Sequence, residues 1–130
     1  MTVADPRPDL AAYAEVARMN TAQLVGALRD LLGAKLVAYL GGVKETRAVR
    51  QWADGTRSIA SATDLERLRI AYRAARMITE SDSPEVAQVW FLGLNPALDD
   101  RSPAWLLREG DLDDVGRQVL AAARHFASLG

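Results

Sequence analysis

Apolar residues recur at intervals of three and four along most of this chain, and no segment alternates apolar and polar residues as a half-buried β-strand does. Two stretches show the spacing most clearly: Leu24, Leu28, Leu31 and Leu32 in the first, and Leu112, Val115, Val119, Ala122 and Phe126 in the second. Residues spaced in this way share one face of an α-helix, which can be buried while the opposite face meets water. The sequence therefore predicts an all-α chain.

Glycines divide the first half of the chain. Four helices are expected there, over residues 10–17, 21–32, 34–40 and 44–54. The first is weak, with Leu10 and Tyr13 on its apolar side, and Thr21 is the expected cap of the second. Gly33, the pair Gly41-Gly42 and Gly55 follow the other three, where glycine commonly ends a helix.

A fifth helix is expected to begin at Thr63, because Thr63-Asp64-Leu65-Glu66 has the form of a capping box. Its expected buried stripe consists of Leu65, Leu68, Tyr72, Ala75 and Ile78. Its expected outer face carries Arg69, Arg73 and Arg76. The polar stretch over residues 79–83 that follows is expected to separate two domains.

Three further helices are expected beyond that stretch. Ser83-Pro84 and Ser102-Pro103 each place a capping residue before a proline at the first helical position. Gly93 and Gly110 are expected to end these two helices in the left-handed conformation, and Asp111 is expected to begin the last one. The chain thus divides into a flexible arm (residues 1–8), a first domain (9–79) and a second domain (83–130).

Composition restricts the kinds of site that this chain can hold. Its 130 residues are 49% hydrophobic, which is enough for one compact domain or two small helical ones. The absence of cysteine excludes disulfides and thiolate chemistry, and a single histidine leaves few options for a transition metal, so we expect neither a metal site nor a cofactor. No membrane span and no signal peptide are recognisable, and a cytoplasmic location is expected.

Charge is distributed unevenly along the chain. Residues 35–76 contain nine basic and four acidic residues, a net charge of +5, whereas residues 80–130 contain four basic and nine acidic residues, a net charge of −5. This division suggests two partners of different charge, although solvated helix faces alone can produce a similar difference.

Residues 36–54 have the pattern of a helix-turn-helix, in which a short helix, the turn Gly41-Gly42-Val43 and a second helix follow one another. Arg47, Arg50 and Gln51 are expected on the outer face of the second helix, where they could contact base edges in a major groove. The residues expected to contact phosphates are Lys44, Thr46 and Arg57. The alternative is a plain helical hairpin whose charged side faces water.

Two X-Pro pairs constrain the chain in the second domain. Asn95-Pro96 and Ser102-Pro103 fix its direction, so that Trp105 and Leu106 are expected to be presented at a defined angle to the last helix. Rigid apolar anchors of this kind dominate binding energy at protein interfaces. Alternatively these side chains form the core of a helical bundle, which is the favoured interpretation for Trp90 and Leu107.

The order of these signals, Trp90-Phe91-Leu92-Gly93-Leu94-Asn95-Pro96 followed by Ser102-Pro103-Ala104-Trp105-Leu106-Leu107 and Gly110-Asp111, resembles the toxin-binding domain of the Xre/MbcA/ParS antitoxins. The resemblance covers roughly residues 83–130. Residues 36–54 are similar to the Xre-type DNA-binding domain, except that the distance from Gly42 to Trp52 is one residue longer than usual.

The resemblance implies a type II antitoxin that binds operator DNA and neutralises a cognate toxin, commonly a RES-domain enzyme that consumes NAD. It also implies that the carboxyl-terminal end of the chain blocks the active site of the toxin. The residues expected to bind the toxin are Trp105, Leu106, Arg108, Arg124, Phe126, Leu129 and Gly130. A homodimer within a larger toxin–antitoxin complex is expected, since helix-turn-helix proteins commonly match twofold operators.

No catalytic residues are expected. The pairs Asp99-Asp100 and Asp113-Asp114 could supply acid-base groups, but each is expected beside a helix start, where a carboxylate caps free amides. The chain has no phosphate-binding loop, metal-binding histidine pair or nucleophile elbow. Two non-enzymatic alternatives remain: a stand-alone transcriptional regulator without a toxin partner, and a structural adaptor.

Overall fold

The computed structural model describes residues 8–129, and within this range every regular element is a helix and none is a strand, as the sequence predicted. The described elements are α1 (Pro8–Ala17), α2 (Thr21–Leu32), α3 (Ala34–Leu40), α4 (Thr46–Asp54), α5 (Ala62–Thr79), α6 (Pro84–Leu92), the 3-10 turn η1 (Pro96–Leu98), α7 (Pro103–Glu109) and α8 (Leu112–Leu129). The expected arm lies outside the described residues except for Pro8, which begins α1. No helix in the described range is both long and apolar enough to cross a membrane.

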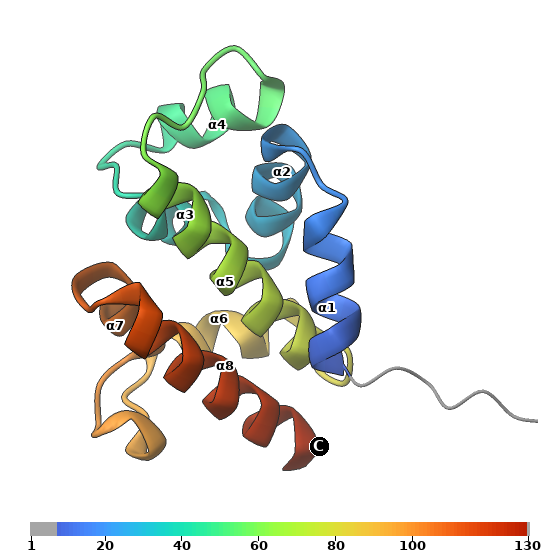
Figure 1. Ribbon diagram of the computed structural model, residues 1–130, viewed down its shortest axis with the longest axis vertical. Helices are drawn as coiled ribbons and strands as arrows, with labels where there is room; N and C mark the ends of the chain where they lie inside the picture. The colour runs from blue at the N-terminus through green and yellow to red at the C-terminus, as the bar shows by residue number, and fades with distance from the viewer. Residues whose placement is uncertain (1–7, 130) are drawn as a thin grey trace, which may run out of the picture.

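Helix α5 occupies the centre of the molecule, and α1, α2, α3, α6 and α8 all pack against it. Helix α8 runs alongside α5 over most of its length (Figure 1). Helix α4 packs on α2 and α3 at one end of the molecule, and α7 joins α3, α6 and α8 on one side. The first and the last of the described helices therefore pack on the same central helix.

One hydrophobic core includes buried side chains from both sides of the polar stretch between α5 and α6. Leu28 and Leu68 belong to it, as do Phe91 and Leu107, and none of the four exposes as much as 2% of its surface. Gly116 allows α8 to approach α5 closely, since a Cβ atom there would lie 3.0 Å from Cδ1 of Ile70. The polar stretch thus joins two helices of a shared core.

The helix caps agree with the sequence prediction in part. Ser83 and Ser102 accept hydrogen bonds from the amides of Val86 and Trp105, as expected of N-cap residues before proline. By contrast, α5 begins earlier than expected, because Ser61 and not Thr63 is its cap. The cap of α2 is Asn20, one residue before the expected Thr21.

The backbone differs from the expected pattern at four residues of the second half. Gly93 and Gly110 have φ of −81° and −89°, so neither adopts the left-handed conformation. Asp99 and Asp100 do adopt it, with φ of 56° and 59°. Their carboxylates therefore follow η1 in a tight turn, and the expectation that they cap a helix was wrong.

The packing of α1 against α5 exposes an aromatic residue that was expected to be buried and covers two arginines that were expected in solvent. Tyr13 is 57% exposed, because α1 packs through Ala12 and Val16 instead. The side of α5 that α1 covers carries Arg73 and Arg76, which were expected in solvent. Both arginines are half-buried, and Arg76 forms an ion pair of 3.1 Å with a glutamate of α1.

Candidate functional site

The turn between α3 and α4 is fixed by close packing. Gly41 has no room for a side chain, since a Cβ atom there would lie 2.7 Å from Cζ3 of Trp52. Gly42 has φ of 82°, which disfavours other residues. Val49 and Trp52 are buried, as expected, and hold the inner face of α4 against its neighbours. The outer face of α4 is left exposed.

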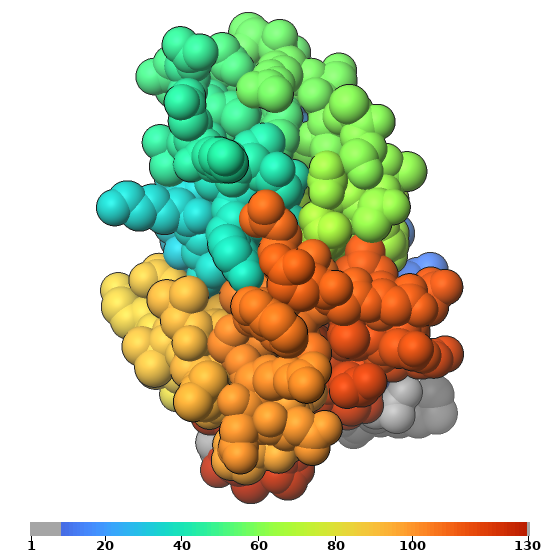
Figure 2. Space-filling model, turned by 90° about the vertical axis from the view of Figure 1, so that its left-hand side faces the viewer, coloured from blue at the N-terminus to red at the C-terminus, as the bar shows by residue number. Residues whose placement is uncertain are grey.

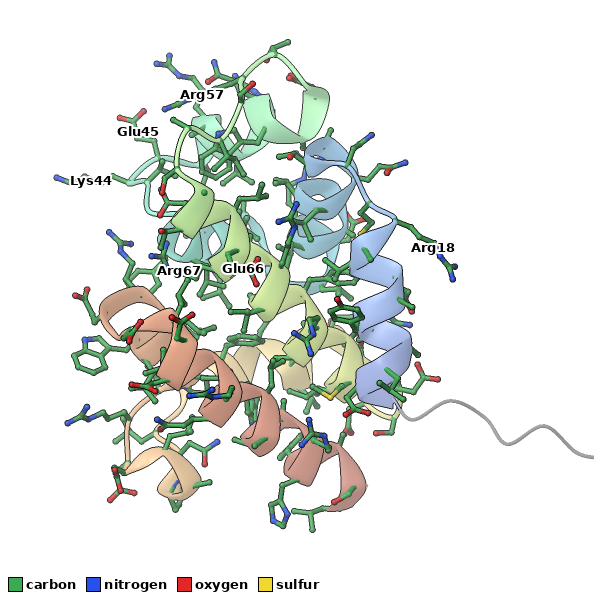
Figure 3. The ribbon with its side chains drawn as sticks, viewed as in Figure 1. Arg18, Lys44, Glu45, Arg57, Glu66 and Arg67 are labelled. Carbon is green, nitrogen blue, oxygen red and sulfur yellow. The ribbon has the colours of Figure 1, made fainter. Side chains whose placement is uncertain are left out.

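The residues expected to contact DNA lie on and around this outer face. Arg47, Arg50 and Thr46 of α4 are exposed, as are Lys44 before the helix and Arg57 after it, while Gln51 is half-buried. Figure 3 shows Lys44 and Arg57 projecting from the same end of the molecule, with Glu45 between them. The structure therefore brings the five exposed side chains together around α4, whereas Gln51, expected among them, is partly covered.

Two shallow hollows on this surface share Arg47. Lys44 and Arg57 line the first, and Arg29 and Arg50 line the second. Arg29 was not anticipated, because it belongs to α2 and reaches the surface only through the packing of α2 on α4. Within the described residues, none of these five cations forms an ion pair.

The carboxylate of Asp54 organises the end of α4. It accepts hydrogen bonds from the hydroxyl and the amide of Thr56, at 2.6 Å and 3.0 Å. These hydrogen bonds lower the pKa of Asp54 from its usual value, and the bond from the hydroxyl has the larger effect. Gly55 adopts the left-handed conformation here, and the Arg57 amide donates back to Gln51 O. The position of Arg57 is thus defined by a capped helix end.

The second expected surface is only partly as predicted. Trp105 is 44% exposed, and the guanidinium of Arg101 lies 5.3 Å from the centroid of its ring. Leu106, which was expected beside it on the surface, is 6% exposed and belongs to the core, as does Leu107. Ala104 is buried as well, so α7 packs through Ala104, Leu106 and Leu107 and leaves Trp105 on its outer side.

Arg108 was expected to bind the toxin, but its guanidinium has contacts within the protein. Its Nη1 donates a hydrogen bond of 2.6 Å to the carbonyl oxygen of Tyr39, and the guanidinium lies 5.0 Å from the centroid of the Tyr39 ring. Arg108 therefore holds α7 against α3, and its half-buried side chain contributes positive charge to the surface beside it.

Arg67 is a buried cation that the sequence did not single out. Its Nε donates to the carbonyl oxygen of Leu107 at 2.9 Å, and its Nη1 donates to the carbonyl oxygen of Leu40 at 3.0 Å and to Asp64 at 2.7 Å. Figure 3 shows it between α5 and α7. Arg67 thus links the ends of α3 and α7 to α5.

The end of α8 carries the remaining residues expected to bind the toxin. Arg124 forms an ion pair of 3.1 Å with Asp9 of α1, and Phe126 is half-buried with its ring centroid 6.4 Å from that of Trp90. Leu129 is 71% exposed. Gly130 lies outside the described residues. Of this set, Leu129 is the side chain most available to a partner.

An apolar groove separates the junction of α2 and α3 from α6 and α7. Its volume is about 580 Å³, and its lining includes Leu36 and Tyr39 on one side and Leu92 and Trp105 on the other. Leu92 is 64% exposed. This groove could not be predicted from the sequence, because it forms between segments far apart in the chain.

Comparisons with models of protein families, with curated proteins and with solved structures returned no match.

Proposed function

We propose that this protein is a type II antitoxin that neutralises a toxin through its carboxyl-terminal helices and binds operator DNA through α4. The observation that carries the proposal is the apolar groove, at which Leu92 and Trp105 expose 64% and 44% of their surfaces. Apolar side chains gathered at a groove are typical of a protein interface. The resemblance of residues 83–130 to the Xre/MbcA/ParS antitoxins supports a toxin, of the RES-domain type, as the partner.

The surface of α4 supports the DNA-binding part of the proposal. Arg29, Lys44, Arg47, Arg50 and Arg57 are exposed around it, with no ion pair among the described residues. Clustered cations of this kind attract phosphates whatever the base sequence, and arginines on a helix in the major groove can select guanine. A cytoplasmic protein that assembles as a homodimer on a twofold operator would use this surface twice.

Co-expression with a RES-domain enzyme, sought first in the neighbouring open reading frames, tests the antitoxin function. We expect the full chain to restore growth and cellular NAD and to co-purify with the enzyme. The intact chain should be used, because cutting it after α5 would expose core residues that pack on α8. A full chain that neither protects the cells nor co-purifies with the enzyme would refute the proposal.

Blocking of the toxin by the chain end is tested separately, by Leu129→Asp. Leu129 is 71% exposed, so the substitution should leave the fold intact. We expect the complex to assemble and yet regain NAD-consuming activity. A complex that stays fully inhibited would place the blocking residues elsewhere.

The DNA-binding part is tested by salt titrations on operator and random duplexes. Arg50→Ala should cost about 1–3 kcal/mol on the operator and little on random DNA, because a bidentate contact to guanine exists only on the correct sequence. Arg57→Ala should weaken binding to every duplex and lower the salt slope by about one unit. Operator binding without protection from any toxin would favour the second candidate, a stand-alone transcriptional regulator.

A further inference from the structure

The apolar groove belongs to both halves of the chain. Leu32 and Leu36 line it from the junction of α2 and α3, and Ala104 lines it from α7. Figure 2 shows the orange residues around α7 directly against the teal residues of the α3–α4 region. The groove is therefore a property of the assembled fold.

Two large apolar side chains at this groove, Leu92 and Trp105, are exposed to solvent. Leu92 comes from the end of α6 and Trp105 from α7, and both line the same hollow. Single exposed apolar residues are ordinary, but a large aromatic and a leucine on one concave surface are characteristic of binding sites. An apolar occupant would remove both side chains from water.

The charge around the groove indicates what such an occupant must carry. Among the residues that the structure describes, Lys35 is the sole charged one lining it, and no carboxylate does so. Lys35 and Tyr39 also line an adjoining hollow, to which Lys44 and Arg108 contribute two more cations against the single carboxylate of Glu45. The surface thus changes from apolar beside Trp105 to basic beside Lys44.

We propose that this groove binds an amphipathic helix of the partner protein, with apolar side chains over Leu92 and Trp105 and carboxylates at the end that reaches Lys35 and Lys44. Helices commonly bind apolar grooves through side chains three and four residues apart. Opposite charge at one end fixes the direction in which the helix lies. The inference rests on the proposed function, in which the partner is the toxin.

A second copy of the chain fits this surface less well. Closed dimers commonly use the same patch on both copies, so the groove of one copy would face the groove of the other. Lys35, Lys44 and Arg108 of both copies would then lie in one interface, and like charges in an interface oppose association. The positive rim therefore favours a partner of opposite charge.

The direct test selects binding peptides without reference to any toxin. A displayed library of amphipathic helical peptides, with the residues flanking the apolar stripe randomised, is selected on the full chain. We expect the selected peptides to be enriched in Asp and Glu at one end. Binding of these peptides should shift the NMR signals of the backbone amides of Lys35, Leu92 and Trp105.

Substitutions in the groove provide the matched controls. Leu92→Ser should weaken the selected peptides roughly tenfold or more, since each buried leucine contributes a large share of such an interface. Leu94→Ser is the control, because Leu94 is 76% exposed but does not line the groove. Lys35→Glu should weaken them as well, whereas Arg18→Glu should not, because Arg18 lines neither hollow and projects from the side opposite Lys44 in Figure 3.

Three results would overturn the inference. The selected peptides could lack acidic residues, or they could bind equally well to the Leu92→Ser and Leu94→Ser variants. The third is a dimer in sedimentation equilibrium that Leu92→Ser converts to a monomer, because the occupant would then be a second copy.

The toxin assay separates this inference from the proposed function. If the wild-type protein and Leu92→Ser protect the cells equally, the groove is not the binding site, but the antitoxin function stands. Failure of the wild-type protein to protect would refute the antitoxin, while peptide selection would still decide the groove.

Discussion

Replacing Arg67 by alanine should destabilise the protein more than any substitution of an exposed arginine. The Arg67 side chain is 10% exposed, and it donates to the carbonyl oxygens of Leu40 and Leu107 near the ends of α3 and α7. Each helix ends before the residue four positions further on, whose amide would normally donate to such a carbonyl. No backbone amide of the described loops and turns donates to either carbonyl instead. Arg67 therefore satisfies acceptors that helix ends leave without partners.

The size of the effect follows from these contacts. Hydrogen bonds to a charged group contribute about 1.5–3 kcal/mol each, and disrupting a buried charged cluster costs about 3–5 kcal/mol. We expect Arg67→Ala to lower the free energy of unfolding by about 3–5 kcal/mol, a large part of the 5–15 kcal/mol typical of a domain. With a slope near 2 kcal/mol per molar urea, the midpoint should fall by roughly 2 M.

Arg69→Ala is the matched control, because Arg69 lies two residues away on the same helix. Its side chain is 44% exposed and lies 3.7 Å from Glu66, an exposed pair of the kind that contributes little. Its free energy of unfolding should stay within about 0.5 kcal/mol of the wild-type value. Urea unfolding followed by circular dichroism and tryptophan fluorescence measures both variants. Equal midpoints for the two would refute the role given to Arg67.

Two further variants test the packing and the pH dependence. Gly41→Ala should cost about 1–3 kcal/mol through its clash with Trp52, whereas Gly26→Ala, which meets nothing within 4 Å, should gain about 0.5–1 kcal/mol; thermal unfolding compares them. The hydrogen bond from Arg76 lowers the pKa of Glu15, so its contribution to stability is present above the unfolded value, taken as 4.5, and lost as the pH falls through the folded value. Glu15→Gln should therefore lose less stability than the wild type between neutral pH and pH 3. Melting temperatures that fall equally with pH in the two proteins would contradict this.

Features set by neighbouring residues in the chain could be predicted from the sequence. The bounds of the short helix over residues 34–40 were predicted correctly, because a glycine stands at each end. The two Ser-Pro pairs marked helix starts in the same way. The cap of α5 was misplaced because Ser61 and Thr63 both precede an acidic residue by three positions, and local pattern does not decide between overlapping caps.

Features that depend on which helices meet could not be predicted. Leu106 and Trp105 are both large and apolar, and nothing in their order indicates which one faces the core. Arg67 stands between Glu66 and Leu68, where a charged residue would normally meet water. Its burial requires the ends of α3 and α7 to converge on α5, which is a consequence of the whole fold.

Helix α3 connects the two proposed binding surfaces. Its residues Lys35 and Tyr39 line the groove, and the turn over residues 41–45 joins its last residue to α4. The carbonyl groups of the last turn of α3 are held by Arg67 from α5 and by Arg108 from α7. A helix anchored in this way cannot shift beside the groove without disturbing either these hydrogen bonds or the packing around Gly41. Binding in the groove and binding at α4 both depend on this helix, so both should weaken together when Arg67 is replaced by alanine.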